Sequence, residues 1–304
     1  MKTNAQIEVR RCRPLLGAFV AIQAFGTDAG DLERAVEAAF LAIAQVHRLM
    51  SFHDLESEVS RMNLDAYHKA VRVHPWTWRV LKSAQEFSRN TDGIFDITMA
   101  GQLVKWNYLP RHGARFSFSS GNWRDIILEA TGRIRFRRPL LIDLGGIAKG
   151  FAVDRAVEVL KRNRVMAGIV NAGGDLCVFG SASQIVHLRH PAQPNRAAAA
   201  VTLRERAIAT SGIYFARTKN RGRCVSPMLD GRTNRAVCDL ISVTVGAANC
   251  MTADALTKVV FALREQAAPL LARYFADALL LEQNGVQSWM FHSTCDTSRQ
   301  SQSD

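Results

Sequence analysis

The sequence lacks the short motifs by which the commonest nucleotide, metal and redox sites are recognised. Its 304 residues contain six cysteines but no Cys-x-x-Cys pair, which argues against a zinc cluster and a dithiol redox site. No Gly-x-x-x-x-Gly-Lys-Ser/Thr loop occurs, and Gly145, Gly146 and Gly150 have the wrong spacing for a Rossmann fingerprint. A nucleotide would therefore be bound by another architecture. We expect most of the cysteines to be inert small apolar residues, as in a reducing compartment.

Long apolar runs are also missing. No stretch reaches the roughly 20 apolar residues that a membrane-spanning helix needs, so we expect no membrane span. Arg10 and Arg11 precede an apolar run and faintly resemble a twin-arginine export signal. However, Arg13 and Pro14 interrupt the approach, and no Ala-x-Ala cleavage site follows. We therefore predict a cytoplasmic protein in which residues 15–25 form the first strand.

Acidic residues are few relative to basic ones. Lys and Arg number 39 against 27 Asp and Glu, which gives a formal net charge of +12 and a pI of about 9.9. This balance favours an anionic partner such as a nucleotide, a nucleic acid or an acidic protein. Residues 102–138 combine arginines with aromatic side chains, a composition that can stack on nucleic-acid bases. We favour strands and loops with half-buried aromatics there, and keep a basic nucleic-acid-binding module as an alternative.

Hydrophobic residues make up 48% of the chain, enough to build a large core without disulfides. We find no internal repeat and no break in composition, so we predict one domain over residues 1–292 and a polar, disordered tail at 293–304. Apolar stripes at helical spacing predict helices over 31–50, 75–91, 147–163, 251–263 and 266–276. Short apolar runs predict strands within 165–180, 185–206, 236–246 and 287–291.

The chain is organised around residues 140–154, LLIDLGGIAKGFAVD. Its first three residues, 140–142, form a short apolar run that is typical of a strand buried on both faces. Asp143 stands where this predicted strand ends. Gly145 and Gly146 free the backbone for a tight turn and leave no side chain over it. The segment therefore predicts a buried strand, a glycine turn and the start of a helix.

The start of this predicted helix is suited to an anion. A helix that opens beside glycines presents free N–H groups and a positive dipole end, which favour a ligand such as a pyrophosphate. Lys149 adds a cation at the same place. An ordinary strand-to-helix connection without a ligand is the alternative, because glycine turns are common.

Six segments occur in an order and at separations that match one family. In chain order they are SFHDLESEVSRMN, TDGIFDIT, IDLGGIAKGFAVD, NAGGD, ATSGIY and CMTADALTKVV. Together they resemble the ApbE family, the FAD:protein FMN transferases, and the resemblance runs from about Arg13 to Leu281. It implies an α+β, T-fold-related single domain with mostly antiparallel sheets, flanking helices and a central nucleotide cleft.

The resemblance implies a reaction. Family members bind FAD and a magnesium ion, cleave the FAD pyrophosphate, join FMN through a phosphoester to a Ser or Thr of an acceptor protein, and release AMP. The acceptors are usually flavin-carrying subunits of membrane electron-transfer complexes. We therefore expect an Mg-dependent transferase that acts on FAD and an acceptor flavoprotein, with no nucleic acid as partner. Such catalysis rests on positioning and on neutralising phosphate charge.

The resemblance also implies site residues. FAD would be contacted by Leu16, His53, Ile94, Phe95, Asp96, Asp143, Lys149 and Leu229. Magnesium would be bound by the Gly146 carbonyl, the carboxylate of Asp254 and Thr257, since a hard cation prefers oxygen ligands, and Asp254 would be catalytic. Taken alone, Asp254 could cap its helix, His53 could be a surface histidine, and Asp96 could form an Asx turn.

Two positions depart from the family pattern. Four residues after Asp254 the family usually has Thr or Ser, whereas this chain has Lys258. Thr257 could supply the hydroxyl instead, the Lys258 ammonium could replace part of the metal's charge, or Asp254 and Lys258 could form a surface pair. Pro227 occupies the position of a histidine that the family commonly carries. If that histidine is the general base, the alternative is a non-catalytic FAD-binding protein of the same fold.

Overall fold

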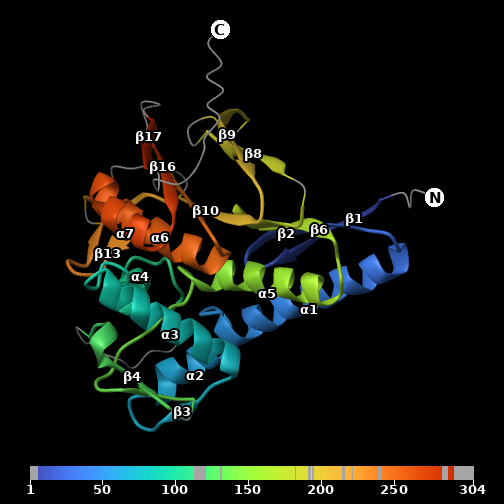
Figure 1. Ribbon diagram of the computed structural model, residues 1–304. Helices are drawn as coiled ribbons and strands as arrows, with labels where there is room; N and C mark the ends of the chain where they lie inside the picture. The colour runs from blue at the N-terminus through green and yellow to red at the C-terminus, as the bar shows by residue number, and fades with distance from the viewer. Residues whose placement is uncertain are drawn as a thin grey trace.

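An antiparallel sheet of eight strands is the framework of the molecule (Figure 1). The structure is a computed structural model that describes residues 6–112, 121–130, 132–181, 183–190, 193, 195–213, 216–220, 222–238, 242–282 and 287–290. In spatial order the strands are β1 (Ile7–Leu15), β2 (Ala18–Gly26), β6 (Ala167–Ala172), β7 (Asp175–Phe179), β10 (Arg206–Gly212), β15 (Ser242–Ala247), β16 (Asp277–Leu281) and β17 (Gln287–Met290). Each neighbouring pair runs antiparallel.

Three helices pack against the large sheet and enclose the main core with it (Figure 1). They are α1 (Ala29–Met50), α5 (Ala148–Arg162) and α6 (Cys250–Leu263). Their apolar residues repeat at helical spacing, so each helix turns a continuous stripe inward. Phe40 of α1, Phe151 of α5 and Phe261 of α6 are among the largest fully buried side chains. The packing of these three apolar stripes therefore fixes the positions in space of the first turns of α5 and α6.

A second, smaller core uses side chains of β7, β10 and β16 that are separate from the main core. The hairpin of β8 (Gln184–Arg189) and β9 (Ala197–Leu203) contributes Leu188 and Leu203 to it. Two further pairs are β11 (Thr218–Asn220) with β12 (Arg223–Val225), and β13 (Leu229–Asp230) with β14 (Arg235–Ala236).

The remaining elements lie beyond α1 and α5 or at the end of α6 (Figure 1). They are α2 (Glu58–Asp65), α3 (Pro75–Asn90), α4 (Ala100–Lys105), α7 (Ala268–Arg273) and the 3-10 turns η1 (Ile97–Met99), η2 (Trp123–Asp125) and η3 (Arg264–Ala267). The three-stranded sheet β3 (Val71–Arg72), β5 (Arg133–Phe136) and β4 (Ile126–Glu129) lies beside α2.

The predicted fold class is confirmed, since helices and mostly antiparallel sheets form one domain. The predicted helices are present, although the last one is shortened to α7 because residues 264–267 form a 3-10 turn instead. The strand predicted over residues 15–25 is wrong at its start. Leu16 and Gly17, with φ values of 57° and 70°, make the turn between β1 and β2, so the chain enters the sheet one strand earlier.

The predicted strand over residues 140–142 is also wrong. The three residues are buried but pair with no strand. The Ile142 N–H donates to the Asn63 side-chain oxygen at 2.8 Å, and the Asn63 amide donates to the Ile142 carbonyl at 3.0 Å. The Asp143 N–H donates to the Ile97 carbonyl at 2.9 Å. A side chain and a neighbouring loop thus satisfy backbone groups that a strand would have bonded to its partner.

The cysteines correct a second expectation. Cys224 and Cys238 form a disulfide, with Cα atoms 6.4 Å apart, that joins the end of β12 to the segment after β14. Cys177 and Cys250 are buried free thiols, as expected of small apolar residues. Burial raises the pKa of the Cys177 thiol to about 12. The tail predicted to be disordered, 293–304, lies outside the described residues.

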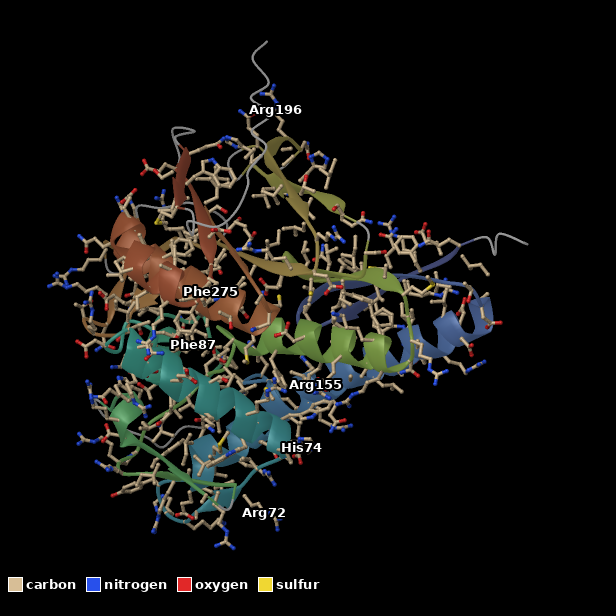
Figure 2. All side chains as sticks on the ribbon, in the orientation of Figure 1. Arg72, His74, Phe87, Arg155, Arg196 and Phe275 are labelled. Atoms are coloured by element: carbon tan, nitrogen blue, oxygen red, sulfur yellow. A yellow bond between two sulfur atoms is a disulfide. The ribbon has the colours of Figure 1, made fainter. Side chains whose placement is uncertain are left out.

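The aromatic residues of the 102–138 stretch that the structure describes are used in packing. Trp123 is buried, and the Tyr108 hydroxyl donates to the carbonyls of Ala216 and Val225. Basic side chains are spread around the molecule, with Arg72 and Arg196 at opposite ends (Figure 2). These features favour strands and loops with packed aromatic side chains in this stretch over a surface that stacks on nucleic-acid bases. Within the described ranges, no helix is long and apolar enough to cross a membrane.

Candidate functional site

A cavity of about 410 Å³ opens at the N-terminal end of α5. Five parts of the chain line it: residues 94–109 around η1 and α4, residues 143–149, the last residues of β10, residues 227–229, and Lys258 of α6. Its volume lies within the range of small-molecule sites. The cavity therefore brings together several of the segments that the sequence singled out.

Seven of the predicted site residues line this cavity: Ile94, Phe95, Asp96, Asp143, Gly146, Lys149 and Leu229. Four do not. Leu16 lies in the β1–β2 turn and packs against the core, and the exposed His53 lies outside the cavity but close enough to influence Asp143 electrostatically. Asp254 and Thr257 are fully buried behind the wall that Lys258 forms.

Asp96 has both a local structural role and a place in the cavity wall. It is the N-cap of η1, and its carboxylate accepts from the Thr98 N–H and hydroxyl, both at 2.8 Å. The other carboxylate oxygen accepts from the Trp123 N–H at 3.1 Å. Burial raises the pKa of Asp96 to about 6 against the opposing effect of these hydrogen bonds. The Asx turn that the sequence allowed at Asp96 is therefore present.

Asp143 and the glycines after it form the approach to α5. Burial raises the pKa of Asp143, while hydrogen bonds from the Gly145 and Leu144 N–H groups and the nearby His53 oppose the shift. The N-cap residue of α5, Ile147, makes no side-chain hydrogen bond to the first turn. The positive end of this helix is thus directed to a segment that lines the cavity, which is the arrangement expected of an anion site.

Lys149 forms the first of two buried ion pairs at the cavity. Its ammonium donates to the Asp175 carboxylate at 2.5 Å, and Asp175 is only 1% exposed. Burial raises the pKa of Asp175 to about 6, and the Asp254 charge adds to the shift, although Lys149 opposes it. Burial lowers the pKa of Lys149, but Asp175 and Asp254 outweigh it, so the net shift is upward. Lys149 therefore remains charged.

Lys258 and Asp254 form the second pair. The Lys258 ammonium contacts the Asp254 carboxylate and also donates to the Asp254 carbonyl at 3.0 Å and to the Ser211 hydroxyl at 3.3 Å. Asp254 is 1% exposed and Lys258 18% exposed. The sequence left open a surface contact between these two residues, but the pair is largely buried, and Lys258 lines the cavity.

Two aspartates cap each other's helices. Asp254 of α6 accepts from the Gly150 N–H in the first turn of α5 at 3.1 Å. Asp154 of α5 accepts from the first two N–H groups of α6, those of Cys250 and Met251, at 2.7 and 2.9 Å. A Cβ on Gly150 would lie 2.3 Å from the Cys250 carbonyl oxygen, so only glycine permits this approach. These caps fix the position of Lys149 on α5 relative to Lys258 on α6.

The residues expected to bind magnesium do not fit that ion as they are arranged. Both oxygens of the Asp254 carboxylate already accept hydrogen bonds, from Gly150 and Lys258. The Thr257 hydroxyl donates to the Asp254 carbonyl at 2.7 Å and shares a bond with Ser211. Magnesium requires several oxygens at close range in octahedral geometry. Among the described residues no group of three or more His, Cys, Asp or Glu side chains is placed to hold a metal.

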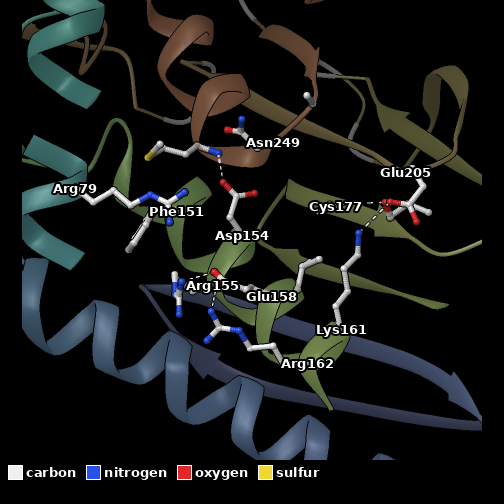
Figure 3. Close-up of a pocket in the computed structure, with 14 residues that line it drawn as sticks. Arg79, Phe151, Asp154, Arg155, Glu158, Lys161, Arg162, Cys177, Glu205 and Asn249 are labelled. Atoms are coloured by element: carbon white, nitrogen blue, oxygen red, sulfur yellow. Dashed lines mark hydrogen bonds and ion pairs between the residues drawn. The ribbon is translucent and has the colours of Figure 1, made fainter. Parts of the chain in front are cut away.

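A larger hollow, of about 520 Å³, runs along α5 beyond its first turn (Figure 3). Its walls carry two sets of ion pairs. Lys161 pairs with Glu205, both about half exposed, and Glu158 pairs with the exposed Arg162 and the buried Arg155. Arg155 also stacks on the Trp76 ring. Three of its cations are thus paired with carboxylates, and none of the predicted site residues lines this hollow.

Two site residues carried only weak signals in the sequence. Asp175 lies in the NAGGD segment, and Ser211 lies in the ATSGIY segment. Both segments belong to the matched set, which was the available signal. Their pairing with Lys149 and Lys258 depends on strand neighbours that are far apart in sequence.

Comparisons with known proteins agree on one family. A Klebsiella pneumoniae protein named FAD:protein FMN transferase is 25% identical over 284 residues, which cover 89% of this chain and 88% of that protein. One of the same name from Treponema pallidum is 24% identical over 311 residues, with coverages of 90% and 84%.

Solved structures share the fold. The crystal structure of an ApbE protein from Thermotoga maritima has a TM-score of 0.82 and 25% identity, and covers 93% of this chain and 96% of its own. The apo form of the Pseudomonas stutzeri flavinyl transferase ApbE has a TM-score of 0.79 and 21% identity, with coverages of 97% and 100%. The ApbE family matches residues 1–280 of the sequence. The chain belongs to the ApbE family.

Proposed function

We propose that this chain is an FAD:protein FMN transferase that attaches FMN through a phosphoester to a Ser or Thr of an acceptor flavoprotein. The observation that carries the proposal is the cavity at the start of α5, where Asp143, Gly146 and Lys149 meet Asp96 and Lys258. Two ammonium groups and a helix N-terminus are suited to a diphosphate. The names of the relatives support the same activity.

In the proposed step the acceptor hydroxyl oxygen forms a bond to the phosphorus of the FMN half of FAD. The bond from that phosphorus to the bridging oxygen breaks, and AMP leaves with that oxygen and its electron pair. We propose that the hydroxyl proton passes to water; the Pro227 side chain in the cavity wall cannot accept it. Lys149 and Lys258 neutralise the charge on the phosphate oxygens as the bond breaks.

We assign the FAD contacts to the lining residues among those predicted: Ile94, Phe95, Asp96, Asp143, Lys149 and Leu229. Leu16 and His53 have no place in this assignment, because neither lines the cavity. The acceptor we propose is a flavin-carrying subunit of a membrane electron-transfer complex, by analogy with the family. Magnesium is given no part in the step, because two of its expected ligands, the Asp254 carboxylate and the Thr257 hydroxyl, already make hydrogen bonds within the protein.

The experiment is incubation of the protein with FAD and a candidate acceptor, followed by intact-mass measurement of the acceptor and chromatography of AMP. We expect the acceptor to gain one FMN and AMP to appear in equal amount. An acceptor variant in which the flavin-bearing Ser or Thr is replaced by Ala is the control. AMP without a mass increase would mean that water, rather than an acceptor, is the nucleophile.

A second candidate is a non-catalytic FAD-binding protein, and the observation that favours it is Pro227 in the cavity wall. The same experiment separates the two. A protein that binds FAD, seen as a change in flavin fluorescence, but yields neither AMP nor a modified acceptor is a binder only. Replacement of Pro227 by His in the chain then tests whether the missing imidazole is the reason.

A further inference from the structure

The ammonium of Lys258 occupies the position where the family resemblance places a metal. An ammonium group has three N–H donors. Those of Lys258 have three acceptors: one oxygen of the Asp254 carboxylate, the Asp254 carbonyl at 3.0 Å and the Ser211 hydroxyl at 3.3 Å. The group is therefore held from three sides by oxygen atoms, as a small cation would be.

The lysine stem reaches over the glycine turn that was expected to give the metal its carbonyl ligand. A Cβ built on Gly146 would lie 3.4 Å from the Lys258 Cε. Both residues line the cavity. A cation bound between Gly146 and Asp254 would thus have to displace the Lys258 side chain from its bonds to Asp254 and Ser211.

Lys258 already supplies a positive charge to the carboxylates around it. It is paired with Asp254, and its charge also acts on Asp175 and Asp143. A divalent ion added beside Asp254 would lie next to an ammonium group and would be repelled by it. A diphosphate, in contrast, would meet the ammonium ends that face the cavity.

The three bonds of Lys258 are not equal. Those to Asp254 join neighbouring turns of one helix, whereas the bond to the Ser211 hydroxyl is the longest and reaches a residue that itself lines the cavity. A phosphate oxygen can replace the Ser211 hydroxyl as acceptor without breaking the contacts to Asp254. The lysine can therefore bind an anion and stay anchored.

We propose that the Lys258 ammonium stands in place of the divalent cation at Asp254, so that this chain binds the FAD diphosphate without a metal. The proposal rests on the proposed function for the identity of the ligand. It distinguishes this chain from family members with Thr or Ser at that position, and it assigns Asp254 the role of positioning Lys258.

The first experiment measures FAD binding by flavin fluorescence in EDTA and in magnesium chloride, and manganese binding by electron paramagnetic resonance without FAD. For the natural chain we expect the Kd for FAD to agree within about twofold between the two buffers, and manganese to remain free. In Lys258→Thr we expect FAD affinity in EDTA to fall roughly tenfold or more, because a charge-assisted bond is lost. Magnesium should restore it, and manganese should bind.

Lys161→Thr is the matched control, since Lys161 also pairs with a carboxylate but lies in the outer hollow. It should behave as the natural chain in both buffers. Stoichiometric manganese binding by the natural chain, or loss of its FAD affinity in EDTA, would overturn the proposal. If Lys258→Thr does not fold, these two measurements on the natural chain still decide. If the natural chain binds no FAD in either buffer, the proposed function fails, while the manganese titration decides the metal question separately.

Discussion

The two hollows along α5 hold the same kinds of ion pair in different surroundings. At the cavity, Asp175 and Asp254 are each 1% exposed and their lysines 33% and 18%. In the outer hollow, Lys161 and Glu205 are 48% and 52% exposed. Two charges 4 Å apart interact by about 1 kcal/mol in water but about 4 kcal/mol near a protein surface of lower dielectric. Burial rather than residue type therefore separates an anion site from a solvated surface.

The largest effect that would test this contrast is expected from Lys149→Met. Removal of the ammonium leaves Asp175 buried without its partner, which should lower the free energy of unfolding by about 3 kcal/mol. It also removes one of two cations from the cavity, so the Kd for FAD should rise about 10- to 100-fold. Urea unfolding and flavin fluorescence measure the two effects. A normal Kd with lowered stability would show that Lys149 serves the fold alone.

Reduction of the Cys224–Cys238 disulfide should have the next largest effect on stability and on FAD affinity. The bond closes a loop that contains residues 227–229 of the cavity wall. By the chain-entropy account, opening a loop of this length lowers the free energy of unfolding by about 2 to 3 kcal/mol. FAD affinity should fall with it, because the wall loses a constraint. The double variant Cys224→Ser, Cys238→Ser should match the reduced protein and show no response to dithiothreitol.

Titration should affect Asp96 of the cavity and Glu205 of the outer hollow in opposite directions. The pKa of Asp96 is about 6 in the folded chain, above its ordinary value of 3.8, so the folded state binds more protons in this range. Its contribution therefore makes the fold less stable as pH rises from about 4 to 6, by about 1 to 2 kcal/mol. Asp96→Asn should flatten that part of the curve of unfolding free energy against pH.

Glu205 of the outer hollow behaves in the opposite sense. Its hydrogen bond from Lys161 lowers its pKa, so its contribution is present above the ordinary pKa and is lost as pH falls through the folded value. Glu205→Gln should therefore remove a rise of the unfolding free energy with pH, whereas Asp96→Asn removes a fall. If Asp96→Asn leaves the slope between pH 4 and 6 unchanged, the burial assigned to Asp96 is wrong.

The smallest effect is expected from Lys161→Met. This lysine lies on the same helix as Lys149 and also pairs with a carboxylate, at 3.0 Å, but both partners are about half exposed. Exposed pairs contribute about 0 to 1 kcal/mol, so the melting temperature and the Kd for FAD should hardly change. A large loss of FAD affinity would identify the outer hollow as part of the nucleotide site.

Much of the fold followed from periodicity in the sequence, because helices such as α1 and α6 carry long apolar stripes. The backbone conformation of residues 140–142 could not be predicted from this periodicity. An apolar run shows that a segment is buried but not which groups bond its backbone, and here the partner is the side chain of Asn63, distant in sequence. The disulfide was missed for the same reason, since pairing depends on Cα distances that spacing alone does not give.

The site was predictable where one segment carried several of its residues. Asp143, Gly146 and Lys149 lie within seven positions of the sequence, and all three line the cavity. The relation of Asp254 to Lys258 was left open by the sequence, because residues four apart on a helix are neighbours whether they are exposed or buried. Only the packing of α6 against β10 and α5 decides between these cases.

The exchanged caps of α5 and α6 have a consequence for the order in which the chain folds. Each helix supplies the hydrogen-bond acceptor that the first turn of the other needs, over separations of 104 and 96 residues. Neither first turn is complete until both have docked, and contacts between such distant segments form slowly. A nascent chain that ends before α6 therefore has no finished diphosphate site, and FAD should begin to protect the protein from proteolysis only after its last third has been synthesised.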